Sequence, residues 1–229
     1  RFSSLLAATS DFIGLQGSQR DEHTRMGAKM DLVWRLVNGE MAGETIANED
    51  LTLCDLSGSD LRGTRFEAAD LRGSSFQNAN LTGAHFDRAD VDFVNWRGAI
   101  ISDAMLPLKA ALVWRVSNED GTGQDFTARD LSSSTFVQPR LSKAKLVRAN
   151  FSRSILLEAD LREADLEAGN FTDADLTGSD LSGANLARAN LRNADLTNAN
   201  LQGANLDGAG QTGTIFRNTT MPDGTVRNP

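Results

Sequence analysis

The sequence predicts a mainly β fold in which the chain coils repeatedly around one apolar interior. An apolar residue, here called the centre of its unit, recurs at every fifth position. It does so 28 times, in a run of eleven from Leu51 to Ile101 and a run of seventeen from Phe126 to Leu206. Two positions before the centre, the residue is small in 23 of the 28 units. The residue directly before the centre is most often Asp or Asn.

A period of five fits neither regular secondary structure. Five residues advance an α-helix by roughly 500°, so successive centres would form no stripe. On a straight strand, an odd period sends alternate centres to opposite faces. The chain must therefore turn once per unit, with the centre and the small residue inside. Asp and Asn suit the outer positions, where their short side chains can bond the backbone.

The unit reads Ala-(Asp/Asn)-Leu-x-x, as in Ala184-Asn185-Leu186 and Ala194-Asp195-Leu196. This pattern resembles the repeat of the pentapeptide-repeat family. The resemblance implies a right-handed quadrilateral β-helix, in which four units form one coil of twenty residues. The 28 units would then form about seven coils.

Two helical segments are expected beside the repeats. Residues 20–38 and 103–118 have apolar residues at helical spacing, and both contain the string Leu-Val-Trp-Arg, 80 residues apart. We interpret each helix as a cap on the open end of a stack, which gives two modules. The alternative is one continuous stack with a helical excursion. The predicted organisation is an N-terminal helical or cap segment (1–45), a first repeat block (46–101), a helical insertion or cap (102–125), a second repeat block (126–218) and a C-terminal tail (219–229).

The exceptions to the pattern indicate where stacks end. Large polar residues replace the small residue at Glu49, Gln124 and Arg129, at the start of each block. Such side chains are expected only in a terminal coil that is not fully enclosed. At the other end, Met221-Pro222-Asp223-Gly224 predicts a turn. This ending is similar to the terminal cap of some bacterial, notably cyanobacterial, family members.

No motif predicts catalysis, a metal or a cofactor. His23 and His85 have no Cys or His neighbour at ligand spacing, and Cys54 occupies a small inward position without a nearby base. The Asp residues lack the Gly-Gly-x-Gly-x-Asp pattern of calcium-binding solenoids, and Asn replaces them freely. We therefore interpret them as structural. The prediction is a protein that is not an enzyme.

Composition and charge point to a macromolecular partner. The net charge of −8 disfavours binding to nucleic acid or to anionic membranes. No apolar run approaches a membrane span of about 20 residues, and no signal peptide is visible in residues 1–19. We expect a cytoplasmic scaffold or protein–protein interaction module, with a removed leader to the periplasm or thylakoid lumen as the alternative location. A small-molecule ligand is not expected.

A second hypothesis is a DNA mimic that binds a type II topoisomerase, because some pentapeptide-repeat proteins act in this way and give quinolone resistance. A stack of ~34 Å would then need on the order of ten negative charges along one side. The two repeat regions, residues 46–101 and 126–229, carry net charges of only −4 and −1. The scaffold hypothesis is therefore preferred.

The charges are also segregated along the sequence. Residues 129–153 carry six bases and one acid, and residues 158–180 carry eight acids and one base. This pattern predicts a charge dipole along the stack and a candidate interaction surface. Its residues are Arg140, Lys143, Lys145, Arg148, Arg153, Glu158, Glu163 and Glu167.

Overall fold

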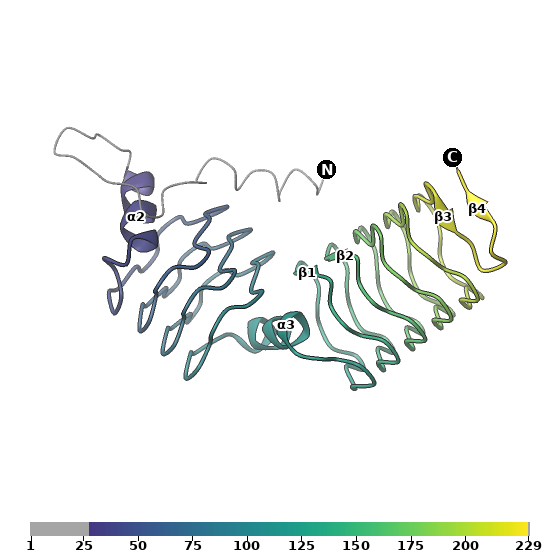
Figure 1. The fold of residues 1–229 in the computed structure, drawn as a ribbon, viewed down its shortest axis with the longest axis horizontal. Coiled ribbons are helices and arrows are strands. Elements are labelled where there is room, and N and C mark those ends of the chain that lie inside the picture. Colours follow the sequence, from purple (N-terminus) through teal and green to yellow (C-terminus); the bar gives the residue numbers. More distant parts are fainter. Residues whose placement is uncertain (1–27, 229) are drawn as a thin grey trace. The chain divides into compact units, whose positions relative to one another are not determined.

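The computed structural model describes residues 28–228, which divide into two compact units, one that ends at Trp114 and one that begins at Arg115. Each unit is a stack of coils, drawn in Figure 1 from purple to yellow along the sequence. The regular elements are few and short. They are α2 (Ala28–Val37), α3 (Leu108–Asn118), β1 (Thr135–Val137), β2 (Ile155–Leu157), β3 (Thr219–Thr220) and β4 (Val226–Arg227).

The coils repeat every twenty residues. Within each stack, parallel bridges join residues that precede a centre to the residue twenty positions later, as from Asp50 to Asp70 and from Asp70 to Asp90. The Leu51 N–H donates forward to the Asp70 carbonyl (2.8 Å), and the Asp70 N–H donates back to the Glu49 carbonyl (3.0 Å). Four five-residue units therefore make one coil. The β1–β2 pair is parallel with the same offset, Thr135 facing Ile155.

Each five-residue unit contains a tight turn directly after its centre. The Cys54 N–H donates to the Leu51 carbonyl at 3.3 Å, which closes a four-residue turn. The third residue of that turn, Leu53, has a φ of 59°, and most other units have a positive φ at the same place. Positive φ at this position is the signature of a type II turn and favours Gly. The residue with the unusual φ thus lies two positions after the centre, and not at the Asp or Asn before the centre.

The centres form the interior of each of the two compact units. In the first unit, Phe66 stacks on Phe86 one coil later, with ring centroids 5.0 Å apart. In the second unit, Phe151 stacks on Phe171 in the same way at 5.3 Å. All four rings are buried. Residues twenty apart thus pack directly on one another, and burial of these large side chains supplies most of the driving force for folding.

The small residues before the centres are mostly inside as well, and several of the polar ones share the same kind of hydrogen-bond partner. The Ser154 hydroxyl donates to the Leu131 carbonyl (2.6 Å), and the Ser179 hydroxyl donates to the Leu156 carbonyl (2.7 Å). In both cases the acceptor is the centre 23 residues earlier, in the preceding coil. These buried hydroxyls are tolerated because they are hydrogen-bonded. Ser59 is an exception, since its buried hydroxyl has no hydrogen-bond partner among the described residues.

Both expected helices are present among the described residues, and α3 has a later start than expected. Of the helix expected at residues 20–38, positions 20–27 lie outside the described residues, and α2 ends at Val37. The helix α3 begins at Leu108 rather than at residue 103, because the coil continues to Met105, which bridges to His85. Pro107 precedes the helix, where its missing N–H has no consequence.

The ends of the stacks have the features that the sequence indicates. Glu49, Gln124 and Arg129 are all exposed. At the C-terminus, β3 and β4 form an antiparallel pair joined by the predicted turn, in which the Gly224 N–H donates to the Met221 carbonyl at 2.9 Å. The predicted turn is confirmed, and the exposure of the three side chains agrees with the terminal position expected for them.

Candidate interaction surface

The Asp and Asn residues before the centres hold the backbone of the following turn. The Thr177 N–H donates to Asp175 Oδ1 at 3.0 Å, and the Ser152 N–H donates to Asn150 Oδ1 at 3.2 Å. Both residue types offer the oxygen that this contact needs. The bond explains why Asp and Asn exchange at this position, and it confirms the structural interpretation of these side chains.

The Asn residues also bond to one another from coil to coil. Asn150 Nδ2 donates to Asp130 Oδ1 (3.0 Å), and Asn170 Nδ2 donates to Asn150 Oδ1 (3.1 Å). A parallel ladder runs from Asn205 through Asn185 to Asp165. Each amide donates to the side chain in the coil that precedes it in the sequence. Asp begins both ladders because a carboxylate accepts hydrogen bonds but has no proton to donate further back.

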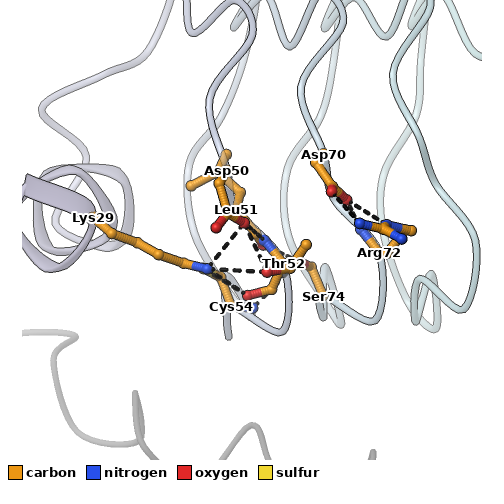
Figure 2. Close-up of polar contacts among 8 residues, drawn as sticks. All are labelled: Lys29, Asp50, Leu51, Thr52, Cys54, Asp70, Arg72 and Ser74. Carbon is orange, nitrogen blue, oxygen red and sulfur yellow. Dashed lines mark hydrogen bonds and ion pairs between the residues drawn. The ribbon is translucent and has the colours of Figure 1, made fainter.

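Where two Asp residues stack, an arginine can separate them. Arg72 Nε donates to Asp70 Oδ1 at 2.8 Å (Figure 2). The same guanidinium lies 3.6 Å from Asp90 in the next coil. The hydrogen bond from Arg72 lowers the pKa of the Asp70 carboxyl below its usual value. Arg162 makes the same contact with Asp160 and lowers its pKa too.

The helix α2 is joined to the first coils by one lysine. Lys29 Nζ donates to Asp50 Oδ1 (3.1 Å), to the Thr52 carbonyl (2.9 Å) and to Thr52 Oγ1 (3.1 Å), as Figure 2 shows. The Asp50 carboxylate also accepts the hydroxyl and N–H of Thr52. These hydrogen bonds, with the contact from Lys29, lower the pKa of Asp50 to about 2. The ammonium thus uses all three of its protons.

Cys54 is a buried filler beside this contact. It is fully buried, and burial raises the pKa of its thiol to about 12. The adjacent Ser74 hydroxyl donates to the Leu51 carbonyl at 2.5 Å, so it offers no free base (Figure 2). A protonated, enclosed thiol cannot act as a nucleophile.

Within residues 28–228, no His, Cys, Asp or Glu residues gather in threes at metal-binding distance. His85 lies in the ladder between Arg65 and Met105, and His23 lies outside the described residues. A small hollow near the C-terminus is lined by Thr214, Ile215, Phe216 and Arg227, with no acid or base pair suited to catalysis. No helix among the described residues has the length and apolarity to cross a bilayer.

The eight residues of the candidate surface do not share one face. Because the coil has twenty residues, only positions that differ by twenty lie directly above one another, and among the eight this holds for Lys143 and Glu163 alone. Their side chains are 3.7 Å apart. Arg148 and Arg153 border a different side of the coil. The two charge blocks of the sequence therefore wrap around the stack.

Several of these charges have partners inside the protein. Arg140 lies 3.9 Å from Asp120, and Glu158 accepts a hydrogen bond from Gln138 at 2.7 Å. Glu167 pairs with Arg188. Lys145 bridges to Asp125 and Asp165 through the backbone, and Arg148 and Arg153 have no ion pair in the part of the chain that the structure describes.

Sorting the charges by their place in the coil reveals a pattern that the linear sequence hides. Residues 148–153, 168–173 and 188–193 occupy one side of three successive coils and carry four arginines and one acid, a net charge of 4 − 1 = +3. The other three sides of the same coils, residues 154–167 and 174–187, carry one base and seven acids, a net charge of 1 − 7 = −6. Sequence reasoning missed Arg188 and Arg192 on the first side. Their position relative to the period of twenty could have revealed them.

The geometry defines a solenoid of five-residue units, and comparison with known proteins agrees. A family model for pentapeptide repeats matches eight copies, over residues 50–88, 136–173 and 174–209. The chain belongs to the pentapeptide-repeat family, whose fold is of the β-helix type. No curated protein matches the chain.

Three solved structures illustrate the likeness. HetL, a pentapeptide repeat protein involved in heterocyst differentiation regulation from the cyanobacterium Nostoc sp. strain PCC 7120, is 25% identical over 89% of this chain and 100% of its own, with a TM-score of 0.35. A pentapeptide repeat protein from the Arabidopsis thaliana thylakoid lumen is 33% identical over 45% of this chain and 72% of its own (TM-score 0.37). Full-length QnrB1, a plasmid-mediated fluoroquinolone resistance protein, is 17% identical over 80% of this chain and 79% of its own (TM-score 0.28).

Proposed function

We propose that the protein is a non-catalytic scaffold or protein–protein interaction module. The observation that carries this proposal is that the positions of each five-residue unit have different structural roles. In most units the centre and the small residue are buried, the Asp or Asn holds the turn, and the two residues after the centre vary and reach solvent. A stack of this kind presents chosen side chains at fixed spacing, which suits recognition of another protein.

We also propose that the coils are the right-handed quadrilateral that the family resemblance implies, and that α2 and α3 act as caps. Buried Val33 and Leu36 on α2, together with the Lys29 contacts, support the first cap. For α3, the Trp114 indole donates to the Ala99 carbonyl at 2.7 Å, and Arg115 lies over the Phe126 ring at 5.7 Å. A stack with such caps exposes fewer unpaired backbone groups.

A DNA mimic directed at a type II topoisomerase is the alternative. Such a mimic needs carboxylates that are free to replace phosphates. Many acids here are already engaged: Arg62, Arg72 and Arg162 each bind the Asp two residues earlier. Acids neutralised within the protein present little charge to a DNA-binding groove, so this arrangement favours the scaffold.

An affinity pull-down with the full chain tests the proposal directly. The expected result is the capture of a specific protein partner that the protein does not modify chemically. DNA gyrase supercoiling in the presence of micromolar protein tests the alternative, and inhibition there would replace the scaffold with the mimic. The expected cytoplasmic location, against the periplasm or thylakoid lumen, is tested by fractionating cells that express the native gene.

A further inference from the structure

One side of the coils in the second unit carries amides and arginines where the other sides carry carboxylates. We call it the amide face and define it as the outward side chains of residues 148–153, 168–173 and 188–193. Its residues before the centres are Asn150, Asn170 and Asn190. Its net charge of +3 contrasts with −6 on the other sides of the same coils. The amide face is therefore a local positive surface on an acidic protein.

Three arginines on this face are available to a partner. Arg148, Arg153 and Arg192 are exposed, and none has an acidic side chain within ion-pair distance in the part of the chain that the structure describes. This differs from Arg162, on another side, whose guanidinium is held by Asp160 at 2.7 Å. A charge without an internal partner does not have to break a contact before it binds a ligand.

The backbone fixes where these arginines stand. Arg148 and Arg153 occupy the turns that bound this side of one coil, with φ values of 57° and 60°. Arg192 lies on the same side two coils later, at an axial distance of ~9.6 Å given the strand spacing. An extended peptide covers that distance with about three residues. Carboxylates near that spacing can therefore reach both levels, and guanidinium groups bind carboxylates in a planar, two-pronged geometry.

Between the arginines the surface is polar and ordered. Thr172 Oγ1 donates a hydrogen bond to Asn170 Oδ1 (2.7 Å) and accepts one from Asn190 Nδ2 (2.8 Å). Amide and hydroxyl groups of this kind can bond the backbone of an extended peptide. Phe151 and Phe171, the centres of this side, are buried. The face therefore offers no ring for the base stacking that single-stranded nucleic acid favours.

We propose that the amide face binds an extended acidic peptide segment of a partner protein. This inference rests on the proposed interaction function and gives its partner a chemistry. Charge complementarity sets the preference, because the face is positive while the whole chain is negative. The acidic sides repel the same segment and so direct it to one side of the stack. A long polyanion such as nucleic acid would meet that repulsion as well.

Fluorescence anisotropy tests the proposal with a labelled nonapeptide that carries Glu at every second position, so that its carboxylates share one face of the extended chain. The full chain is expected to bind this peptide at least about tenfold more tightly than its Lys counterpart, and more weakly as salt rises. Replacing Arg148, Arg153 and Arg192 by Glu should weaken binding about tenfold or more. The matched control replaces Arg140, Lys143 and Lys145 by Glu, an equal charge change on other sides, and should alter binding less than about twofold. Circular dichroism melting confirms that both variants fold.

Three results would overturn the proposal. These are no preference for the Glu peptide, an equal loss in both variants, or tighter face-dependent binding of a nine-nucleotide oligothymidine, which would indicate nucleic acid. The pull-down separates this inference from the general function. A partner captured equally by the parent and by the amide-face variant would retain the interaction function and refute the face. Face-dependent peptide binding with no captured partner would support the amide face and count against the general interaction function.

Discussion

Asn170 donates its side-chain amide to Asn150 Oδ1 at 3.1 Å, across the twenty residues that make one coil. Asn150 in turn donates to Asp130, so the three side chains form a ladder with one direction. The direction follows from the turn, because each oxygen is already committed to the N–H two residues later. The order of Asp and Asn along the ladder is thus a consequence of hydrogen-bond chemistry.

This ladder predicts that Asp and Asn are not interchangeable in every coil. Asn150→Asp removes the donor and stacks one carboxylate on Asp130, so we expect the free energy of unfolding to fall by about 1 kcal/mol. Asp130→Asn keeps the acceptor and should be close to neutral. Urea unfolding at pH 7 measures both. Equal effects of the two changes would contradict the ladder.

The inward position of the centres predicts a large effect of one charge. Leu166 is fully buried, and Leu166→Asp would leave an unpaired carboxylate in the interior. We expect a loss of more than about 4 kcal/mol, seen as unfolding of several coils by circular dichroism. Gln202→Asp, at an exposed position, is the control and should melt like the parent. A normal melting curve for the Leu166 variant would disprove the assignment of centres.

Acid should destabilise the first unit through Asp50. Its pKa falls from 3.8 to about 2 on folding, so the folded state favours the charged form. The resulting stability is present above about pH 4 and is lost as the pH falls towards 2. Because Asp50 is exposed, its share is below about 1 kcal/mol. Melting temperatures from pH 7 to 2 should show a shallower acid loss for Asp50→Asn than for the parent.

Lys29 is predicted to hold α2 in place. Lys29→Ala removes three hydrogen bonds, and we expect a local loss of about 1 kcal/mol. Hydrogen exchange should become faster in α2 while the coils of the second unit keep their protection. Arg35→Ala is the control, because among the described residues the Arg35 side chain forms only an exposed 3.9 Å pair with Glu40. Identical exchange in the parent and the Lys29 variant would remove the lysine from the docking of this helix.

Cys54 should be inert to thiol reagents while the protein is folded. Burial raises its pKa to about 12, so almost no thiolate exists at pH 8. A chromogenic disulfide reagent is expected to label Cys54 only in denaturant, with one thiol per chain. Rapid labelling of the native protein would show that the small inward position is open to solvent.

The interior could be read from the sequence because its period is strict. Leu166 and the other centres repeat every five residues, and a large apolar side chain at this period can be accommodated only in the interior of the coil. The period of twenty is weaker in the sequence, since side chains such as Lys143 and Glu163 meet through space without any local motif. Without that frame, Arg148 and Arg192 cannot be recognised as neighbours on one side.

The length of α3 shows a second limit. Helical spacing near residue 103 cannot reveal that the coil continues to Met105, because that decision depends on a bridge to His85 in the preceding coil. The Ser and Thr residues at inward positions were similarly readable as small, but their carbonyl partners 23 residues earlier emerge only from the stacked geometry. Local pattern gave the composition of each unit, and long-range pairing gave its contacts.

The twenty-residue coil also sets rules for how such a chain can change in evolution. Loss or gain of five residues keeps every centre inside, yet it shifts all later residues to the neighbouring side, so a surface such as that bordered by Arg148 and Arg192 would be broken apart. Loss or gain of twenty residues changes only the length of the stack. Insertion lengths that preserve the fold are multiples of five, and lengths that also preserve a binding surface are multiples of twenty, so the first are four times as numerous. Binding surfaces should therefore be inherited in whole coils.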